Sequence, residues 1–444
     1  MKKHLIATAS VLALSFAGQA MANDSFIDQI GLGNSTLIDQ TGGVEGVSSV
    51  IQDGTNNVAE VTQSENPNGI PNFSIPTNDA SIMQVGENAR ARITQSNPDQ
   101  PNAPTNSATI TQYSNGTPQT PPDGIPSGFS VNANIVQTGS GNTSDILQSD
   151  RPAGSGPASG VTAYNEQVGK DNQSSITQAV RNEDADPYSD VDVFQFGDAN
   201  ISNVEQGGSD SRVLVEQNGV NNFSNVEQRT NREMIATVEQ DGSDHESFVT
   251  QTARTVEATV KQSDTSQFST VFQGPQSRYS EATVTQSGDN NDSDVSQTNT
   301  SAIATVTQSG VDGSSTISQS DGEGAEATLM QSGFGNYNLM TQTGDDQTAS
   351  VTQSGDLNDS TITQSGNDQL ATVLQTGDNN ASFITQSDDN QIAYVEQASH
   401  NNYSEITQSG IGAGNTANVY QLATSGNSSI ISQAGTGNLA TVNQ

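Results

Sequence analysis

The sequence predicts an all-β solenoid built from coils of about 22 residues, each coil holding two strands and two turns. Three observations lead to this fold class. Glutamine returns along the chain with a dominant period of about 11 residues. In the residues before each glutamine, small or aliphatic side chains alternate with threonine, serine, aspartate or glutamate, as in a strand with one buried face. Glycine follows many of these glutamines two positions later, where a tight turn is expected.

Composition alone would favour a disordered chain, since only 30% of the residues are hydrophobic and tryptophan is absent. The regular order of the residues argues against disorder. A net charge of −37 disfavours nucleic-acid binding and binding to anionic membranes, because both need a basic surface. The chain has no cysteine, which excludes disulfides and Cys/His metal sites.

The segment 1–22 resembles a secretory signal peptide. Lys2 and Lys3 precede the apolar stretch 5–17, and Ala20-Met21-Ala22 ends the segment. The apolar stretch is too short to span a membrane as a helix. We therefore expect a secreted mature chain that begins near Asn23 and does not insert into a membrane.

The repeating glutamines, which we call rungs, form the predicted structural ladder. Between positions 286 and 408 every step is 11 residues except the step from Gln319 to Gln331, which is 12. Asn358 and Asn380 lie five positions after a rung and belong to the same ladder. The rungs of this segment are Gln286, Gln297, Gln308, Gln319, Gln331, Gln342, Gln353, Gln364, Gln375, Gln386, Gln397 and Gln408.

The unit that starts at Gln353 shows how each segment between rungs is built. Gly355 lies at rung +2, and Asn358, Ser360 and Ile362 lie at +5, +7 and +9. These last three positions and the next rung share one parity, so a strand directs them to one face. A second unit type has glutamine at +5. The two types alternate, which makes the true repeat a pair of units.

A single unit cannot be stable alone. It buries one aliphatic side chain, worth about 1.5–3 kcal/mol, whereas each ordered residue costs roughly 1–2 kcal/mol of backbone entropy. Stacking of coils about 4.8 Å apart resolves this deficit in a cross-β arrangement. We expect each inward glutamine and asparagine amide to bond to its copy in the coil above and below.

Prolines divide the chain into two regions. Thirteen of the fourteen prolines precede residue 190, where the ladder is stretched at 64–80, 96–106, 113–130, 149–160 and 179–190. Proline interrupts strands, so these segments are predicted loops. We expect a loop-decorated repeat region at 23–190 and a regular solenoid at 191–444. Neither end carries an obvious cap, and uncapped edges favour further strand pairing.

The motif Q-x-G-x-x-N-x-[SA]-x-x-x-Q resembles the curlin repeat of curli fibre subunits. Copies start, among others, at Gln52, Gln137, Gln217, Gln353 and Gln375. The resemblance implies a self-assembling extracellular amyloid fibre for adhesion and biofilm matrix, with a homopolymeric partner, an outer-membrane secretion channel and a surface nucleator. It leaves open whether the chain is a main, accessory or nucleator subunit.

Other functional classes are less well supported by the sequence. His245 and His400 are expected to be surface turn residues, and no catalytic residue or cofactor site stands out, so we expect no enzymatic activity. Acidic residues recur at rung +3, where a stacked row could attract Ca²⁺ as in a calcium-binding β-roll. The acidic residues considered are Asp198, Asp289, Asp345, Asp356 and Asp378.

Two further alternatives remain open. A monomeric β-solenoid adhesin or ice-binding protein would use its outward threonine rows and should carry capped ends. A polysaccharide-active β-helix enzyme would need clustered carboxylates and aromatic subsites, and aromatic residues make up only 5% of the chain.

Overall fold

A computed structural model describes residues 23–41, 46–65, 77–97, 104–115, 131–151, 160–181, 189–207, 210–229, 233–410, 412 and 414–444. These residues form 34 β-strands and no helix, which confirms the predicted all-β class. The described part accordingly contains no helical segment able to cross a membrane. The predicted signal peptide and most residues of the proline-rich loops lie outside the described residues. Several residues of the predicted loops that the structure does describe lie at the ends of strands instead.

Contacts divide the chain into two compact units, Met1–Tyr188 and Ser189–Gln444. The strands of the first unit are 7 to 10 residues long. They are β1 (Asp24–Leu32), β2 (Ser35–Thr41), β3 (Val47–Thr55), β4 (Val58–Glu65), β5 (Asn78–Glu87), β6 (Ala89–Asn97), β7 (Asn106–Asn115), β8 (Val131–Ser140), β9 (Thr143–Arg151), β10 (Val161–Lys170) and β11 (Gln173–Arg181).

The second unit begins with four long and four short strands in alternation, and shorter strands of similar length follow. They are β12 (Ser189–Asp198), β13 (Ile201–Gln206), β14 (Ser211–Val220), β15 (Phe223–Gln228), β16 (Met234–Ser243), β17 (Glu246–Gln251), β18 (Val256–Thr265), β19 (Phe268–Gln273), β20 (Glu281–Gln286), β21 (Asp292–Gln297), β22 (Ile303–Gln308), β23 (Ser314–Ser320), β24 (Glu326–Gln331), β25 (Tyr337–Thr343), β26 (Thr348–Gln353), β27 (Asp359–Ser365), β28 (Leu370–Gln375), β29 (Ala381–Ser387), β30 (Ile392–Gln397), β31 (Tyr403–Ser409), β32 (Thr416–Gln421), β33 (Ser428–Ala434) and β34 (Leu439–Asn443).

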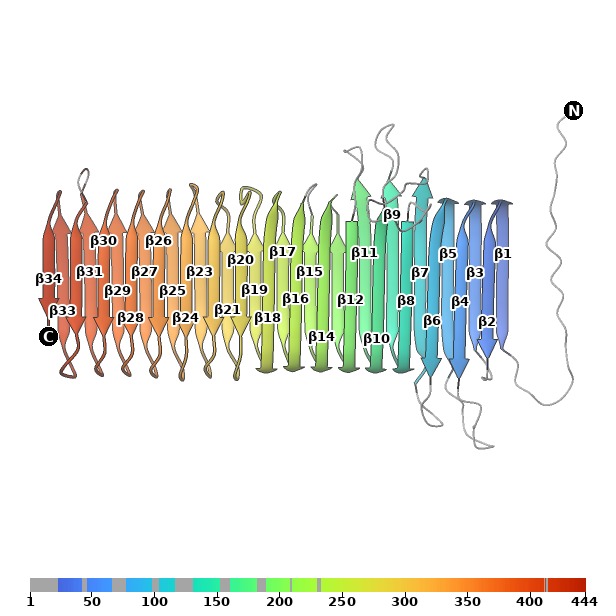
Figure 1. Ribbon diagram of the computed structural model, residues 1–444, viewed down its shortest axis with the longest axis horizontal. Helices are drawn as coiled ribbons and strands as arrows, with labels where there is room; N and C mark the ends of the chain where they lie inside the picture. The colour runs from blue at the N-terminus through green and yellow to red at the C-terminus, as the bar shows by residue number, and fades with distance from the viewer. Residues whose placement is uncertain are drawn as a thin grey trace, which may run out of the picture. The chain divides into compact units, whose positions relative to one another are not determined.

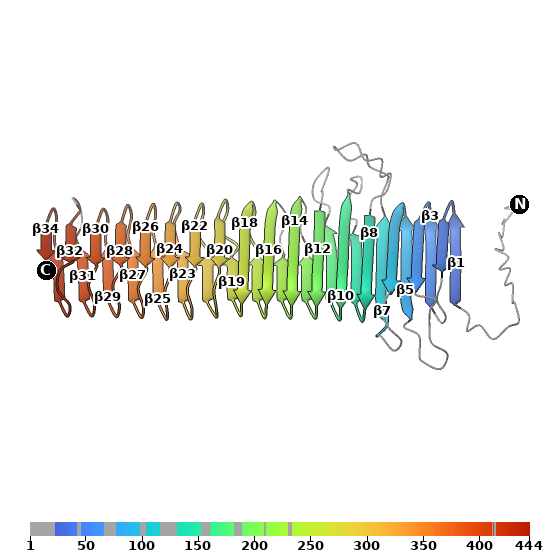
Figure 2. The same ribbon diagram turned by 60° about the horizontal axis from the view of Figure 1, so that its bottom comes forward.

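Within each unit a strand pairs in parallel with the strand two places further along the chain. Odd-numbered strands therefore form one open sheet and even-numbered strands form another, and Figures 1 and 2 show these as two layers in the second unit. The register places equivalent residues opposite each other, as in Gln342↔Gln364 and Ile362↔Ile384. One odd and one even strand make one coil, which confirms the predicted solenoid of two-strand coils.

The core lies between the two sheets and follows the alternation of the sequence. Strand β28 has the burial pattern exposed, buried, intermediate, buried, intermediate, buried, and its buried residues are Ala371, Val373 and Gln375. The facing strand β27 buries Ser360 and Ile362 in the equivalent places. Four positions before the rung, the even sheet has alanine from β16 onward, whereas the odd sheet has serine at nearly every coil.

At rung +2 of Gln364, glycine is required by the close approach of successive turns. Gly366 has φ 139°, and a Cβ atom there would lie 2.3 Å from the carbonyl oxygen of Asp388 in the next coil. Such a contact is too close for any other residue, and the positive φ is also unfavourable for one. Two residues later the left-handed conformation recurs, at Asp368 with φ 53°. The turn geometry thus repeats with the ladder.

Candidate assembly site: the side-chain ladders

The structure buries every residue of the predicted ladder, the glutamines on the inner face of a sheet and the two asparagines in turns. Their exposed fractions are all 3% or less. The residues are Gln286, Gln308, Gln331, Gln353, Gln375 and Gln397 in the even sheet, Gln297, Gln319, Gln342, Gln364, Gln386 and Gln408 in the odd sheet, and Asn358 and Asn380 in the turns that precede odd strands.

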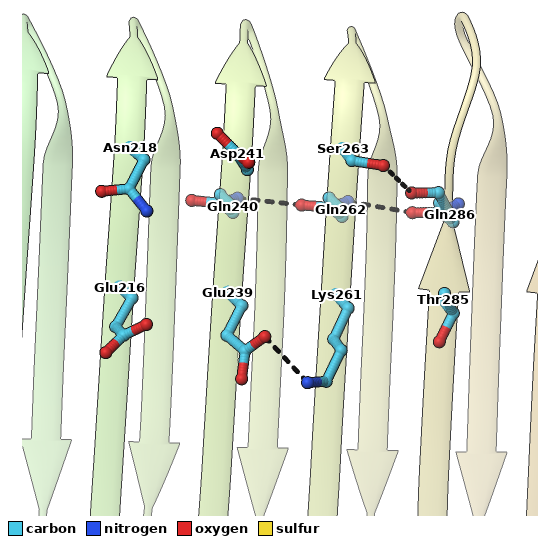
Figure 3. Close-up of a pocket in the computed structure, with 10 residues that line it drawn as sticks. All are labelled: Glu216, Asn218, Glu239, Gln240, Asp241, Lys261, Gln262, Ser263, Thr285 and Gln286. Carbon is cyan, nitrogen blue, oxygen red and sulfur yellow. Dashed lines mark hydrogen bonds and ion pairs between the residues drawn. The ribbon is translucent and has the colours of Figure 1, made fainter.

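Each rung of this predicted ladder donates a hydrogen bond to its equivalent in the next coil. Gln342 Nε2 donates to Gln364 Oε1 at 2.9 Å, and Gln364 Nε2 donates to Gln386 Oε1 at 3.0 Å. Figure 3 shows the same kind of row earlier in the unit, where Gln240, Gln262 and Gln286 are joined at 2.9 Å. Each amide therefore gives one proton and receives one along the row.

The same amide nitrogen also connects the two sheets. Gln364 in the odd sheet donates to the backbone carbonyl of Thr348 in the even sheet at 3.0 Å. Gln375 in the even sheet donates to the carbonyl of Asp359 in the odd sheet, also at 3.0 Å. Sequence reasoning missed this bond, because it runs to backbone atoms that carry no sequence signal. It explains why the buried amide uses both of its protons.

All of these glutamine bonds point the same way along the chain. Nε2 of one coil donates to Oε1 of the coil that follows it in sequence, in both sheets. The ladder therefore has a direction. A coil edge nearer the amino terminus offers Oε1 acceptors, and an edge nearer the carboxy terminus offers Nε2 donors.

The asparagine positions work differently from the prediction. Asn358 Oδ1 accepts the backbone N–H of Asn380 at 3.0 Å, and Asn380 Oδ1 accepts the N–H of Asn402 at 2.9 Å. The expectation that these amides bond to each other is wrong for both residues. In these coils the asparagine oxygen accepts from the next turn's backbone N–H, so this ladder fixes the turns rather than the strands.

His245 is not a surface turn residue. It lies five positions after the rung Gln240, its side chain is fully buried, and its Nδ1 accepts the backbone N–H of Gln267 at 3.2 Å. It occupies the place that asparagine fills elsewhere. The +5 spacing was the signal that could have identified it. His400 is exposed, as expected for a turn residue, and its Nδ1 accepts the N–H of Asp378 at 2.9 Å.

The acidic turn residues form hydrogen-bonded rows. Asp345, Asp356 and Asp378 each accept a backbone N–H from the preceding coil with Oδ1, at 2.9–3.0 Å. Those oxygens are therefore already engaged. Among the described residues, no group of three or more His, Asp or Glu side chains is placed to hold a metal ion.

Charged side chains are exposed on the outer faces of the sheets. A groove on the even sheet near β14–β20 is lined by Glu216, Glu239 and Lys261 among others (Figure 3). Lys261 Nζ lies 2.8 Å from Glu239 Oε2, a solvent-exposed pair worth little energy. Burial, with a smaller effect of Asp190, raises the pKa of Asp192 to about 6.

Comparison with known families agrees with this geometry. Curlin associated repeats match residues 208–252, 322–355 and 356–387. The three matched segments of the chain are therefore similar to the curlin repeat. All three matches fall in the second unit, where the glutamine rows described above lie. Curlin-repeat proteins are structural components of extracellular curli fibres rather than enzymes. No curated protein matches the chain.

Proposed function

We propose that this protein is a secreted structural subunit of extracellular curli-like amyloid fibres. Copies add to one another by continuing the glutamine ladder, and the fibres serve surface adhesion and the biofilm matrix. The protein performs no catalysis in this role. Its other partners are an outer-membrane secretion channel and a curli-type nucleator at the cell surface.

The glutamine ladder is the observation that carries this proposal. Equivalent residues of successive coils lie opposite each other in parallel register, so one coil is a template for the next. A second copy that docks on an open coil edge repeats contacts already present inside the chain. No new type of interaction is needed, which is the physical basis of edge-to-edge growth.

The first and last described strands present suitable edges. In the described part of the chain β1 pairs only with β3, and β34 pairs only with β32. The inner-face residue Ile27 of β1 is 42% exposed, whereas its equivalent Val50 in β3 is fully buried. Docking of the β34 edge of one copy on the β1 edge of another would bury Ile27 in the same way.

Ladder direction supports a head-to-tail arrangement of copies. Gln433 Nε2 donates to the carbonyl of Thr416 and, unlike earlier rungs, has no following rung to donate to within the described residues. At the other edge Gln29 is an exposed rung that donates toward Gln52. Donors at one edge and acceptors at the other match only when copies face the same way.

Fibre diffraction of the purified mature chain, residues 23–444, tests the proposal. We expect fibres in negative-stain micrographs, with reflections at ~4.7–4.8 Å and ~10 Å. A chain that remains monomeric for days at high concentration and gives no such reflections would contradict the fibre function. That outcome would favour the monomeric solenoid adhesin instead.

A further inference from the structure

The asparagine ladder of the second unit contains one titratable group, His245, among the described residues. Its own backbone N–H donates to Asn222 Oδ1 at 3.2 Å, and its Nδ1 accepts the N–H of Gln267 at 3.2 Å. The next step has Gln267 Oε1 accepting the N–H of Asn291 at 3.1 Å. A ring nitrogen therefore replaces an amide oxygen in the row that runs from Asn222 to Asn291.

The two ring nitrogens have opposite roles. Nδ1 can accept from Gln267 only while it carries no proton. Nε2 lies 3.4 Å from the backbone carbonyl of Asp241, which can only accept, so the proton belongs on Nε2. The geometry thus fixes the neutral Nε2–H tautomer. A second proton would have to sit on Nδ1, directly against the N–H of Gln267.

We propose that His245 is a pH-sensitive connection between two coils, which joins the β16–β17 turn to the β18–β19 turn when the imidazole is neutral and releases it when protonated. This inference goes beyond fibre formation, because it concerns a contact inside one chain. Protonation replaces a donor–acceptor pair by two facing donors and places a charge in a buried position. Both effects favour opening of the turn.

The charged groups that face the ring are Asp241 near the end of β16, Asp244 in the β16–β17 turn and Asp264 near the end of β18. The neighbours in the ladder, Asn222 and Gln267, are uncharged. The three carboxylates favour the protonated ring, but burial acts more strongly and lowers the pKa of His245. The unfolded chain therefore binds a proton at higher pH than the folded one. Stability from the neutral ring is present above about pH 6.5 and is lost as pH falls.

Hydrogen exchange measured by mass spectrometry on the full-length mature chain tests this connection. The wild type should lose protection in peptides spanning about residues 241–268 between pH 7.5 and pH 4.5, after correction for intrinsic exchange rates. We expect this loss to grow as the pH falls, because protonation of His245 favours the open turn. His245→Asn, which restores the residue type present at Asn222 and Asn291, should abolish that loss.

His400→Asn is the matched control, because it makes the same substitution at an exposed turn histidine. It should leave the acid-induced loss at 241–268 unchanged. His245→Gln, which copies the residue type of Gln267, gives a second variant if His245→Asn does not fold. Equal loss of protection in the wild type and in the folded His245 variant would overturn the proposal. So would a protonated Nδ1 at pH 7.5 in the ¹⁵N spectrum of the buried histidine.

Discussion

The strands β1–β11 and the strands β20–β34 make the same ladder with very different connections. In the first region the connection from β7 to β8 covers positions 116–130, whereas that from β27 to β28 covers only 366–369. Yet Gln112 Nε2 donates to Gln148 Oε1 at 2.9 Å across 36 residues, and Gln364 donates to Gln386 at 3.0 Å across 22. The inner residues, rather than the turns, therefore set the register.

This difference agrees with the weak dependence of loop closure on length. Doubling a flexible loop costs only about 0.6 kcal/mol, so a long connection is tolerated if the strand that follows returns in phase. A lost rung, by contrast, removes bonds along its row and between the sheets. Substitutions in the ladder should reduce stability in both regions. Longer connections should mainly slow folding and assembly.

The largest effect is expected from loss of three consecutive rungs. Replacing Gln353, Gln364 and Gln375 by alanine leaves buried cavities and unpaired amides and carbonyls in the flanking coils, at about 1–3 kcal/mol for each unsatisfied group. Fibre formation followed by light scattering and electron microscopy should stop or slow by orders of magnitude.

The outward threonines of the same coils provide the control for this experiment. Replacing Thr352, Thr361 and Thr363 by serine removes only methyl groups from partly exposed positions. Assembly of this variant should stay close to that of the wild type. Equal effects of the two triple variants would show that the inner and outer faces have been exchanged.

A fragment comparison separates the two regions directly. Residues 279–444, which include β20–β34, should polymerise alone and faster than residues 23–188. Longer loops must close before each strand of the second fragment docks, which slows folding more than it destabilises the product. Faster assembly of the amino-terminal fragment under matched concentration would contradict this account of the connections.

Turn glycines should matter equally in both regions. Gly54→Ala and Gly366→Ala each place a Cβ within 2.3 Å of a carbonyl oxygen in the next coil, at Gly86 and Asp388 respectively. We expect a loss of at least about 2 kcal/mol for either, measured by denaturant unfolding. Gly437→Ala, where no atom lies within 4 Å, should show only the smaller cost of its positive φ. If Gly54→Ala caused little loss of stability, the turns of the first region would be less tightly packed than those of the second.

Lowering the pH should stabilise the folded protein through carboxyl groups that are buried in the fold. The raised pKa of Asp192, about 6, means that the folded chain binds more protons than the unfolded chain between about pH 4 and pH 6. Stability from this group therefore falls as pH rises through 6. Asp192→Asn should raise stability at pH 7, by no more than about 1 kcal/mol because the carboxylate keeps solvent contact. An unchanged pH profile in urea titrations of the variant would contradict this assignment.

The smallest effect is expected from a buried serine that makes no hydrogen bond. Among the described residues the Ser382 hydroxyl has no partner, whereas Ser48 donates to Gln63 Oε1 at 2.9 Å. Ser382→Ala should be neutral or slightly stabilising, and Ser48→Ala should cost about 1 kcal/mol. Thermal unfolding of the two single variants makes the comparison. A larger cost at Ser382 would show that its hydroxyl is hydrogen-bonded after all.

Sequence periodicity alone determined the strands, their inward faces and the two-strand coil. These features follow from local alternation and from repetition, so the amino-acid pattern by itself places Gln364 and Ile362 inside. The same periodicity placed glycine in the turns, although it did not show that a carbonyl of the next coil occupies the space of the missing Cβ.

Only the tertiary structure decided which atoms each buried polar group meets. The bond from Gln364 to the carbonyl of Thr348, the bond from Asn358 Oδ1 to the N–H of Asn380 and the role of His245 all involve backbone atoms of another strand or coil. Backbone atoms are the same at every residue, so the amino-acid sequence does not indicate which of them a buried side chain contacts. Their positions depend on the spacing of the two sheets and on the direction of the ladder, which only the packed coils define.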